Sequence, residues 1–138
     1  MKTLALASLL TAFFAQSTVH AQTLILPLVE IITSPQDYAG KEVNTVGFLN
    51  EDANMLYLSR DSYEARDMNS AVKIFNLPIR SLKNTPCYLT HVRVIGTFDR
   101  SERFGYRFTN VKFITNSVTD APCYEAPKSD SSGSGPGN

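Results

Sequence analysis

The segment Tyr88–Phe98 alternates between two sets of side chains with a period of two, over more residues than any other part of this chain. One set comprises Thr90, Val92, Val94, Gly96 and Phe98, and the other comprises Leu89, His91, Arg93, Ile95 and Thr97. In an extended strand the two sets face opposite sides. The pattern predicts a β-strand with one buried face, and such a strand needs other strands beside it.

Four further segments predict those partner strands: Val43–Asn50, Met55–Ser59, Ala71–Leu77 and Arg107–Thr115. Two of the five strands contain a glycine, Gly47 and Gly96, which indicates a bulge or a tight bend of the kind that closes a small barrel. Five such strands with one or two short helices predict an all-β fold, a five-stranded OB-type barrel.

The segment Ser34–Gly40 predicts a short helix before the first strand. Ser34 is a good N-cap, Pro35 suits the first helical position, and Gly40 can take the left-handed conformation that ends a helix. The other connections are Leu24–Ile32, which fits either a strand or a turn or two of helix, Arg60–Met68, a loop or short helix, and Asp99–Tyr106, a polar hairpin loop.

Both ends of the chain differ in composition from its middle. Lys2 and the apolar run Leu4–Phe14 predict a secretory signal peptide over residues 1–21, cleaved between Ala21 and Gln22. An uncleaved anchor is the alternative, but the run is shorter than the roughly 20 residues that span a bilayer. The barrel domain is predicted over residues 22–125 and a disordered, Ser- and Gly-rich tail over residues 126–138. We therefore expect a periplasmic or secreted protein without a transmembrane anchor in its mature form.

The two cysteines, Cys87 and Cys123, are 36 positions apart and both follow the predicted cleavage site. In an oxidising compartment an isolated pair predicts a disulfide. A redox pair is the alternative, but redox cysteines usually form a Cys-x-x-Cys motif, which the wide spacing lacks. We expect a structural disulfide.

The near-zero net charge conceals an uneven distribution. Residues 22–67 carry a net charge of −5, whereas residues 73–112 carry +6. Such asymmetry can create a basic surface on a protein that is neutral overall.

OB-type barrels bind ligands across strands two and three and between the loops that join strands one to two and four to five. On the third predicted strand Lys73 and Phe75 face away from Val72 and Ile74. The candidate ligand-binding residues are Tyr57, Lys73, Phe75, Arg93, Arg100, Arg103, Phe104, Tyr106 and Arg107. Arginines among aromatic rings suit a polyanion such as single-stranded nucleic acid. The alternative is that these arginines are ordinary solubilising charges paired with acidic neighbours in the same loop.

Two groups of residues in this chain resemble segments of a known protein family. The first is Ser34-Pro35-x-x-Tyr38-x-Gly40-Lys41-x-Val43 with Gly47-Phe48-Leu49 and Leu56-Tyr57-Leu58-Ser59, and the second is Val92–Phe98 with Thr109-Asn110-Val111. In these segments the chain resembles small exported bacterial OB-fold proteins, which are largely uncharacterised. The resemblance implies the fold and no activity. Thr45 departs from it, because such strands often place valine there, and predicts a more polar barrel floor.

The sequence offers no catalytic constellation. After the predicted cleavage His91 is the sole histidine, and we expect it on the surface without a partner that would make it a base. Serines lack a nucleophile-elbow setting, glycines form no phosphate loop, and the adjacent Glu51 and Asp52 lack the spacing of a calcium loop. We expect no cofactor, no metal and no enzyme activity. The function we predict is an exported binding or interaction module of the cell envelope, whose partner is a protein, an oligosaccharide or a small ligand; a polyanion binder is the alternative.

Overall fold

The computed structural model describes residues 22–75, 77, 82–103 and 105–128. Its elements in chain order are β1 (Leu24–Ile25), α1 (Leu28–Thr33), η1 (Pro35–Asp37), β2 (Lys41–Leu49), β3 (Met55–Tyr57), α2 (Arg60–Glu64), η2 (Met68–Ser70), β4 (Ala71–Ile74), β5 (His91–Ser101), β6 (Gly105–Asn116) and β7 (Pro122–Glu125). The predicted signal peptide and nearly all of the predicted tail lie outside the described residues, so both stay predictions.

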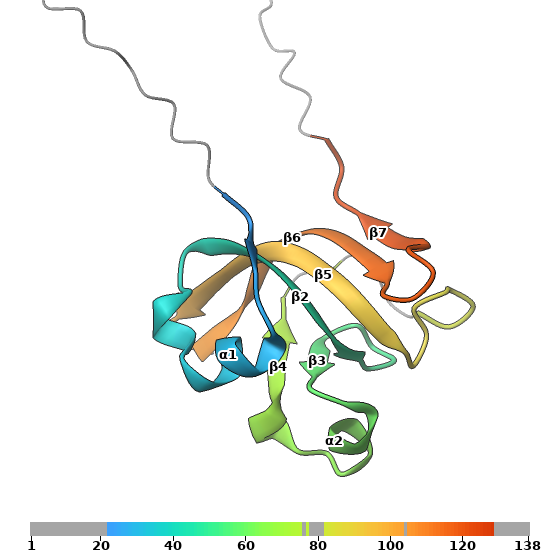
Figure 1. Ribbon diagram of the computed structural model, residues 1–138, viewed down its shortest axis with the longest axis horizontal. Coiled ribbons are helices and arrows are strands. Elements are labelled where there is room, and N and C mark those ends of the chain that lie inside the picture. The colour runs from blue at the N-terminus through green and yellow to red at the C-terminus, as the bar shows by residue number, and fades with distance from the viewer. Residues whose placement is uncertain (1–21, 76, 78–81, 104, 129–138) are drawn as a thin grey trace, which may run out of the picture.

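Five of the strands close into a barrel in the order β2-β3-β4-β6-β5, with β5 pairing back onto β2. The β4–β6 pair is parallel, and the other four barrel pairs are antiparallel. Figure 1 shows the long strands β2, β5 and β6 arching together, with β3, β4 and α2 below them. Two short strands lengthen the sheet outside the barrel, since β1 pairs with β2 and β7 pairs with β6. The all-β barrel predicted from the sequence is confirmed.

All five predicted strands are present, but several of their ends were placed wrongly. β5 begins at His91 rather than Tyr88, because Leu89 has a φ of 46° and lies in a turn. At its other end β5 continues to Ser101, and β6 starts at Gly105. Most of the predicted hairpin loop Asp99–Tyr106 is therefore strand.

The segment before the barrel combines both structures that its sequence allowed. β1 pairs with β2 through two residues, and α1 begins directly after Pro27. The predicted helix Ser34–Gly40 is wrong in extent, since only the single 3-10 turn η1 forms and the Ser34 side chain caps nothing. Ser34 has φ −135° and ψ 53°, which is not a cap conformation, whereas Gly40 takes the expected positive φ of 78°.

The alternation that predicted β5 also defines the core. Val92, Val94 and Phe98 are fully buried inside the barrel, while His91 on the opposite face is exposed. β4 behaves in the same way, with Val72 and Ile74 buried and Lys73 exposed. α1 adds Leu28 and Ile31 to the same core.

Gly47 and Gly96 are required by close packing. A Cβ atom on Gly96 would lie 2.9 Å from the Asn110 carbonyl oxygen and from the Val111 Cα, where β5 and β6 shift register beside Ile95. A Cβ on Gly47 would lie 2.7 Å from side-chain atoms of Leu28 and Leu56, yet the β2–β5 ladder runs through this position without a register shift. The irregularity expected at a glycine thus occurs beside Gly96, where the extra residue is Lys112 of the partner strand β6, and none occurs at Gly47.

Thr45 leaves a polar atom in the barrel interior. Its side chain is 1% exposed, and its hydroxyl finds no hydrogen-bond partner among the described residues. A buried hydroxyl without a partner costs about 1–3 kcal/mol. We therefore expect Thr45→Val, which keeps the shape of the side chain, to raise the free energy of unfolding by about 1 kcal/mol in a urea titration. A destabilised variant would contradict this account of the hydroxyl.

The Cys87–Cys123 disulfide is present, with 6.2 Å between the two Cα atoms. It joins β7 to the turn segment that precedes β5, and Cys87 is fully buried. The predicted pairing is confirmed, although the sequence did not indicate that Cys123 lies on a strand. Within the described ranges no helix is long and apolar enough to cross a bilayer.

Candidate functional site

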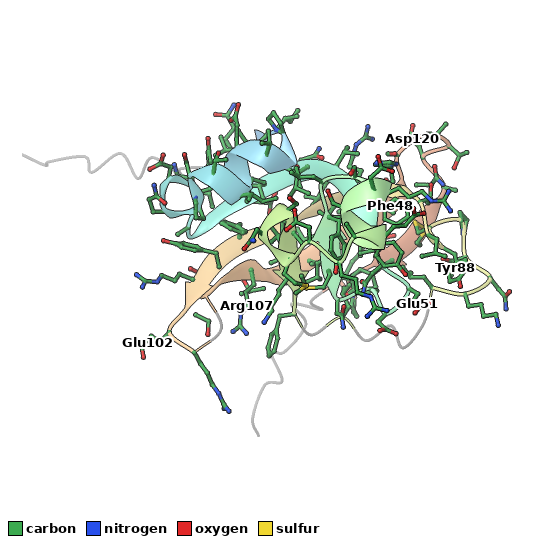
Figure 2. The ribbon with its side chains drawn as sticks, turned by 90° about the horizontal axis from the view of Figure 1, so that it is seen from below. Phe48, Glu51, Tyr88, Glu102, Arg107 and Asp120 are labelled. Atoms are coloured by element: carbon green, nitrogen blue, oxygen red, sulfur yellow. A yellow bond between two sulfur atoms is a disulfide. The ribbon has the colours of Figure 1, made fainter. Side chains whose placement is uncertain are left out.

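Three of the predicted ligand-binding residues gather on the outer face of β4 and β6. Lys73 and Arg107 are opposite each other in the parallel β4–β6 pair, and Phe75 follows Lys73 two residues later on the same face. The Arg107 guanidinium carbon lies 4.0 Å from the centre of the Phe75 ring. Figure 2 shows Arg107 pointing away from the barrel on its lower side. We call Lys73, Phe75 and Arg107 the basic face.

The basic face combines a fixed cation with a mobile one. A guanidinium stacked on an aromatic ring is held in orientation, and the Nε and Nη1 atoms of Arg107 are buried. Lys73 is exposed, and no carboxylate of the described residues forms an ion pair with its ammonium group. The Phe75 ring is 39% exposed and offers an apolar contact beside the two charges.

The hairpin arginines divide between two sides of the sheet. Arg100 pairs with Tyr106 across the β5–β6 hairpin, and its guanidinium carbon lies 5.9 Å from the centre of that ring. Tyr106 itself stacks on Phe98, with ring centres 5.8 Å apart, so it faces the barrel core. Because neighbouring residues of a strand face opposite sides, Arg107 cannot share a surface with Tyr106 and Arg100. Arg100 and Tyr106 therefore lie on one side of the hairpin and Arg107 on the other, and a role for all three in ligand binding stays a prediction.

The hairpin also contains Arg103 and Asp99, which we do not include in the basic face. Arg103 is exposed in the turn between β5 and β6. Asp99 on β5 is the cross-strand partner of Arg107 and therefore adds a negative charge to the same face of the sheet. Phe104 lies outside the described residues, so its predicted role stays a prediction.

Tyr57 is almost fully covered by neighbouring side chains. It is 6% exposed, its ring lies 5.5 Å from that of Tyr63 on α2, and its hydroxyl is directed at the Met68 sulfur at 3.6 Å. Phe48 packs on the other side of Tyr63 at 5.3 Å. Burial, followed by the nearby charge of Glu51, raises the pKa of the Tyr63 hydroxyl. Residues 59–70 therefore cover the part of the β3–β4 face on which Tyr57 was predicted to meet a ligand.

Arg93 belongs to another part of the molecule. It lies on β5 opposite Val46 of β2, and its guanidinium forms an ion pair with Asp120 at 3.0 Å. Lys112 likewise pairs with Glu42, a contact that joins the basic and acidic parts of the sequence. These two ion pairs thus offset part of the charge asymmetry of the sequence. Neither pair includes a residue of the basic face.

The described residues contain no group of three or more histidine, cysteine or acidic side chains that could hold a metal ion. His91 is exposed, and its ring contacts Phe48 edge-on with 5.5 Å between ring centres. No known protein family, curated protein sequence or solved structure matches this chain. The function is therefore argued from the site itself.

Proposed function

We propose that this protein is an exported, non-catalytic binding module that holds an anionic ligand on the basic face. The observation that carries the proposal is the stacking of the Arg107 guanidinium on Phe75 beside the exposed Lys73. Phosphate, sulfate and carboxylate groups accept hydrogen bonds from an oriented guanidinium, and a neighbouring ammonium adds attraction. The aromatic ring supplies a surface for a base or a sugar ring.

The export part of the proposal rests on two observations. The apolar N-terminal segment has the composition of a signal peptide, and the Cys87–Cys123 disulfide is typical of proteins in oxidising compartments. The resemblance to small exported OB-fold proteins supports the same location. The cell envelope contains anionic glycans and lipid headgroups, and both present the groups that the basic face would bind.

Neighbouring acidic groups limit the length of ligand that can be bound. Asp99 lies directly opposite Arg107 on the neighbouring strand. The turn between β2 and β3 carries the exposed Glu51 and Asp52. An anionic chain extended across the whole surface would meet these carboxylates. We therefore infer that the basic face holds two or three anionic groups and not a long polyanion.

A short labelled single-stranded oligonucleotide with two or three phosphate groups is a convenient anionic probe, followed by fluorescence anisotropy at about 50 and 200 mM salt. Phosphate contacts weaken steeply over this range. We expect Lys73→Gln/Arg107→Gln to weaken binding at the lower salt about 100-fold, at roughly 1.4 kcal/mol for each charged contact. The dependence of log K on log salt should become shallower by roughly 1.4, because two phosphate contacts are lost.

The control is Arg60→Gln/Arg66→Gln, which removes the same charge from the surface around α2. Binding by this variant should stay within about twofold of wild type, since a general charge effect is small beside a direct contact. Equal losses in the two double variants, or wild-type binding that ignores salt, would contradict the proposal.

A further inference from the structure

A groove on the opposite part of the barrel is more apolar than the basic face. One wall is the β1–α1 segment Ile25–Val29, the floor is Asn44–Val46 of β2, and Leu58 and Arg93 complete it. The groove encloses about 670 Å³. This volume lies within the range of roughly 300–1,000 Å³ that is usual for small-molecule sites.

The lining residues indicate the shape of a ligand. In the described part of the chain, all of the apolar lining side chains are aliphatic or proline, and none of the lining residues is aromatic. Ile25 is 82% exposed, Val29 47% and Val46 42%, so aliphatic surface is open to solvent on both the wall and the floor. Covering this aliphatic surface with a hydrocarbon chain would be favourable, because both surfaces leave water. The lining suits a flexible hydrocarbon chain better than a planar ring, which would find nothing to stack on.

Among the residues that the structure describes, Arg93 is the single charged one that lines the groove. Its side chain is 41% exposed, and Asp120 accepts one hydrogen bond from its Nη1 at 3.0 Å. A guanidinium has five N–H donors, so donors remain for an anionic group at the edge of the groove.

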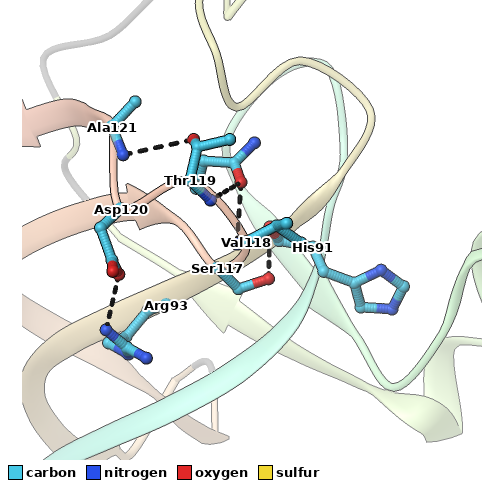
Figure 3. Close-up of polar contacts among 8 residues, drawn as sticks. His91, Arg93, Ser117, Val118, Thr119, Asp120 and Ala121 are labelled. Carbon is cyan, nitrogen blue, oxygen red and sulfur yellow. Dashed lines mark hydrogen bonds and ion pairs between the residues drawn. The ribbon is translucent and has the colours of Figure 1, made fainter.

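The turn that carries Asp120 is itself held in place, as Figure 3 shows. The Asn116 side chain accepts hydrogen bonds from the backbone N–H groups of Val118 and Thr119, and the Ser117 hydroxyl donates to the His91 carbonyl oxygen. Asp120 therefore reaches Arg93 from a fixed position, which orients the guanidinium before a ligand arrives. Arg93 is 41% exposed and Asp120 is 72% exposed, so water screens the ion pair and an incoming anion can compete with Asp120.

We propose that this groove binds the acyl chain of an anionic amphiphile, with the headgroup on Arg93. The aliphatic wall and floor take up the chain, and the oriented guanidinium receives a carboxylate or phosphate. The site is separate from the basic face and does not depend on the function proposed for it.

The test uses dodecanoate as the anionic probe and 1-dodecanol as an uncharged probe of equal chain length, both at concentrations where they remain monomeric. Binding is followed by ¹H–¹⁵N NMR of the protein. We expect saturable dodecanoate shifts at Ile25 and Val46, and about tenfold weaker binding of dodecanol. Arg93→Gln should weaken dodecanoate binding about tenfold and leave dodecanol binding within about twofold, because only the headgroup contact is removed.

Two variants separate the groove from general hydrophobic binding. Val46→Glu places a charge on the floor and should abolish binding of both probes, whereas Tyr88→Glu changes a 38% exposed tyrosine in the turn before β5 and should alter neither. Dodecanoate shifts that are absent, that map to Lys73 and Arg107, or that survive unchanged in both Arg93→Gln and Val46→Glu would overturn the proposal.

Discussion

Replacing Cys87 and Cys123 by alanine is expected to lower the free energy of unfolding by roughly 3–4 kcal/mol, the loop-entropy value for a disulfide that spans 36 residues. The stability of a domain of this size is commonly about 5–15 kcal/mol, so the loss is a large part of the total. Cys87 lies at 0% exposure in the core, and the bridge is the covalent link that holds β7 close to the segment before β5. Urea titrations of the two proteins, followed by far-UV circular dichroism, measure the difference.

Reduction of the wild-type protein supplies the control. With excess reductant the unfolding midpoint should move close to that of the double variant, because both treatments release the same loop. A double variant whose midpoint equals that of the oxidised protein would show that the bridge contributes nothing to stability.

Phe98→Ala is expected to lower the free energy of unfolding by about 4 kcal/mol, as for other large-to-small changes in well-packed cores. Phe98 is fully buried, stacks on Tyr106 and meets Phe108 edge-on with ring centres 5.7 Å apart. These neighbours belong to the β5–β6 hairpin and cannot collapse into the space without shifting the ladder. The remaining cavity therefore adds to the lost burial.

Phe113→Ala is the matched control, because it deletes the same ring from the outer face of β6, where Phe113 is 40% exposed. We expect a loss of about 1 kcal/mol or less, since much of this ring already contacts water. Equal losses for the two variants in urea titrations would contradict the assignment of Phe98 to the barrel core.

The period of two in the sequence predicted the barrel well because each strand has one face inside. Val92, Val94 and Phe98 were placed together on one face of β5, and they are buried together. Lys73 and Phe75 were placed on the outside of β4, and both are exposed there. Such predictions succeed wherever local geometry alone decides which way a side chain points.

The errors arose where distant contacts decide the structure. Tyr57 has the correct face for a ligand, but α2 folds over it through Tyr63, and no local pattern specifies that approach. The strands β1 and β7 have two and four residues, too few for a period to be recognised. The separation of Arg107 from Tyr106 could have been predicted, since adjacent strand residues face opposite sides; grouping them by nearness in sequence concealed it.

The groove residues carried a signal that the sequence analysis did not use. Val46 falls on the outward side of β2 with Asn44, where a solvated strand usually carries polar side chains. An apolar residue on that side, next to the apolar segment Leu24–Ile32, indicates an exposed hydrophobic surface. The volume of the groove still depends on how α1 packs, which only the folded structure gives.

The contact of Tyr63 with Tyr57 and Phe48 has a practical consequence for spectroscopy. The chain contains no tryptophan, so its ultraviolet fluorescence comes from six tyrosines. Two of these, Tyr57 on β3 and Tyr63 on α2, have ring centres 5.5 Å apart. Their emission and near-ultraviolet dichroism should follow the opening of the α2 segment and give the protein an intrinsic optical reporter that needs no attached dye.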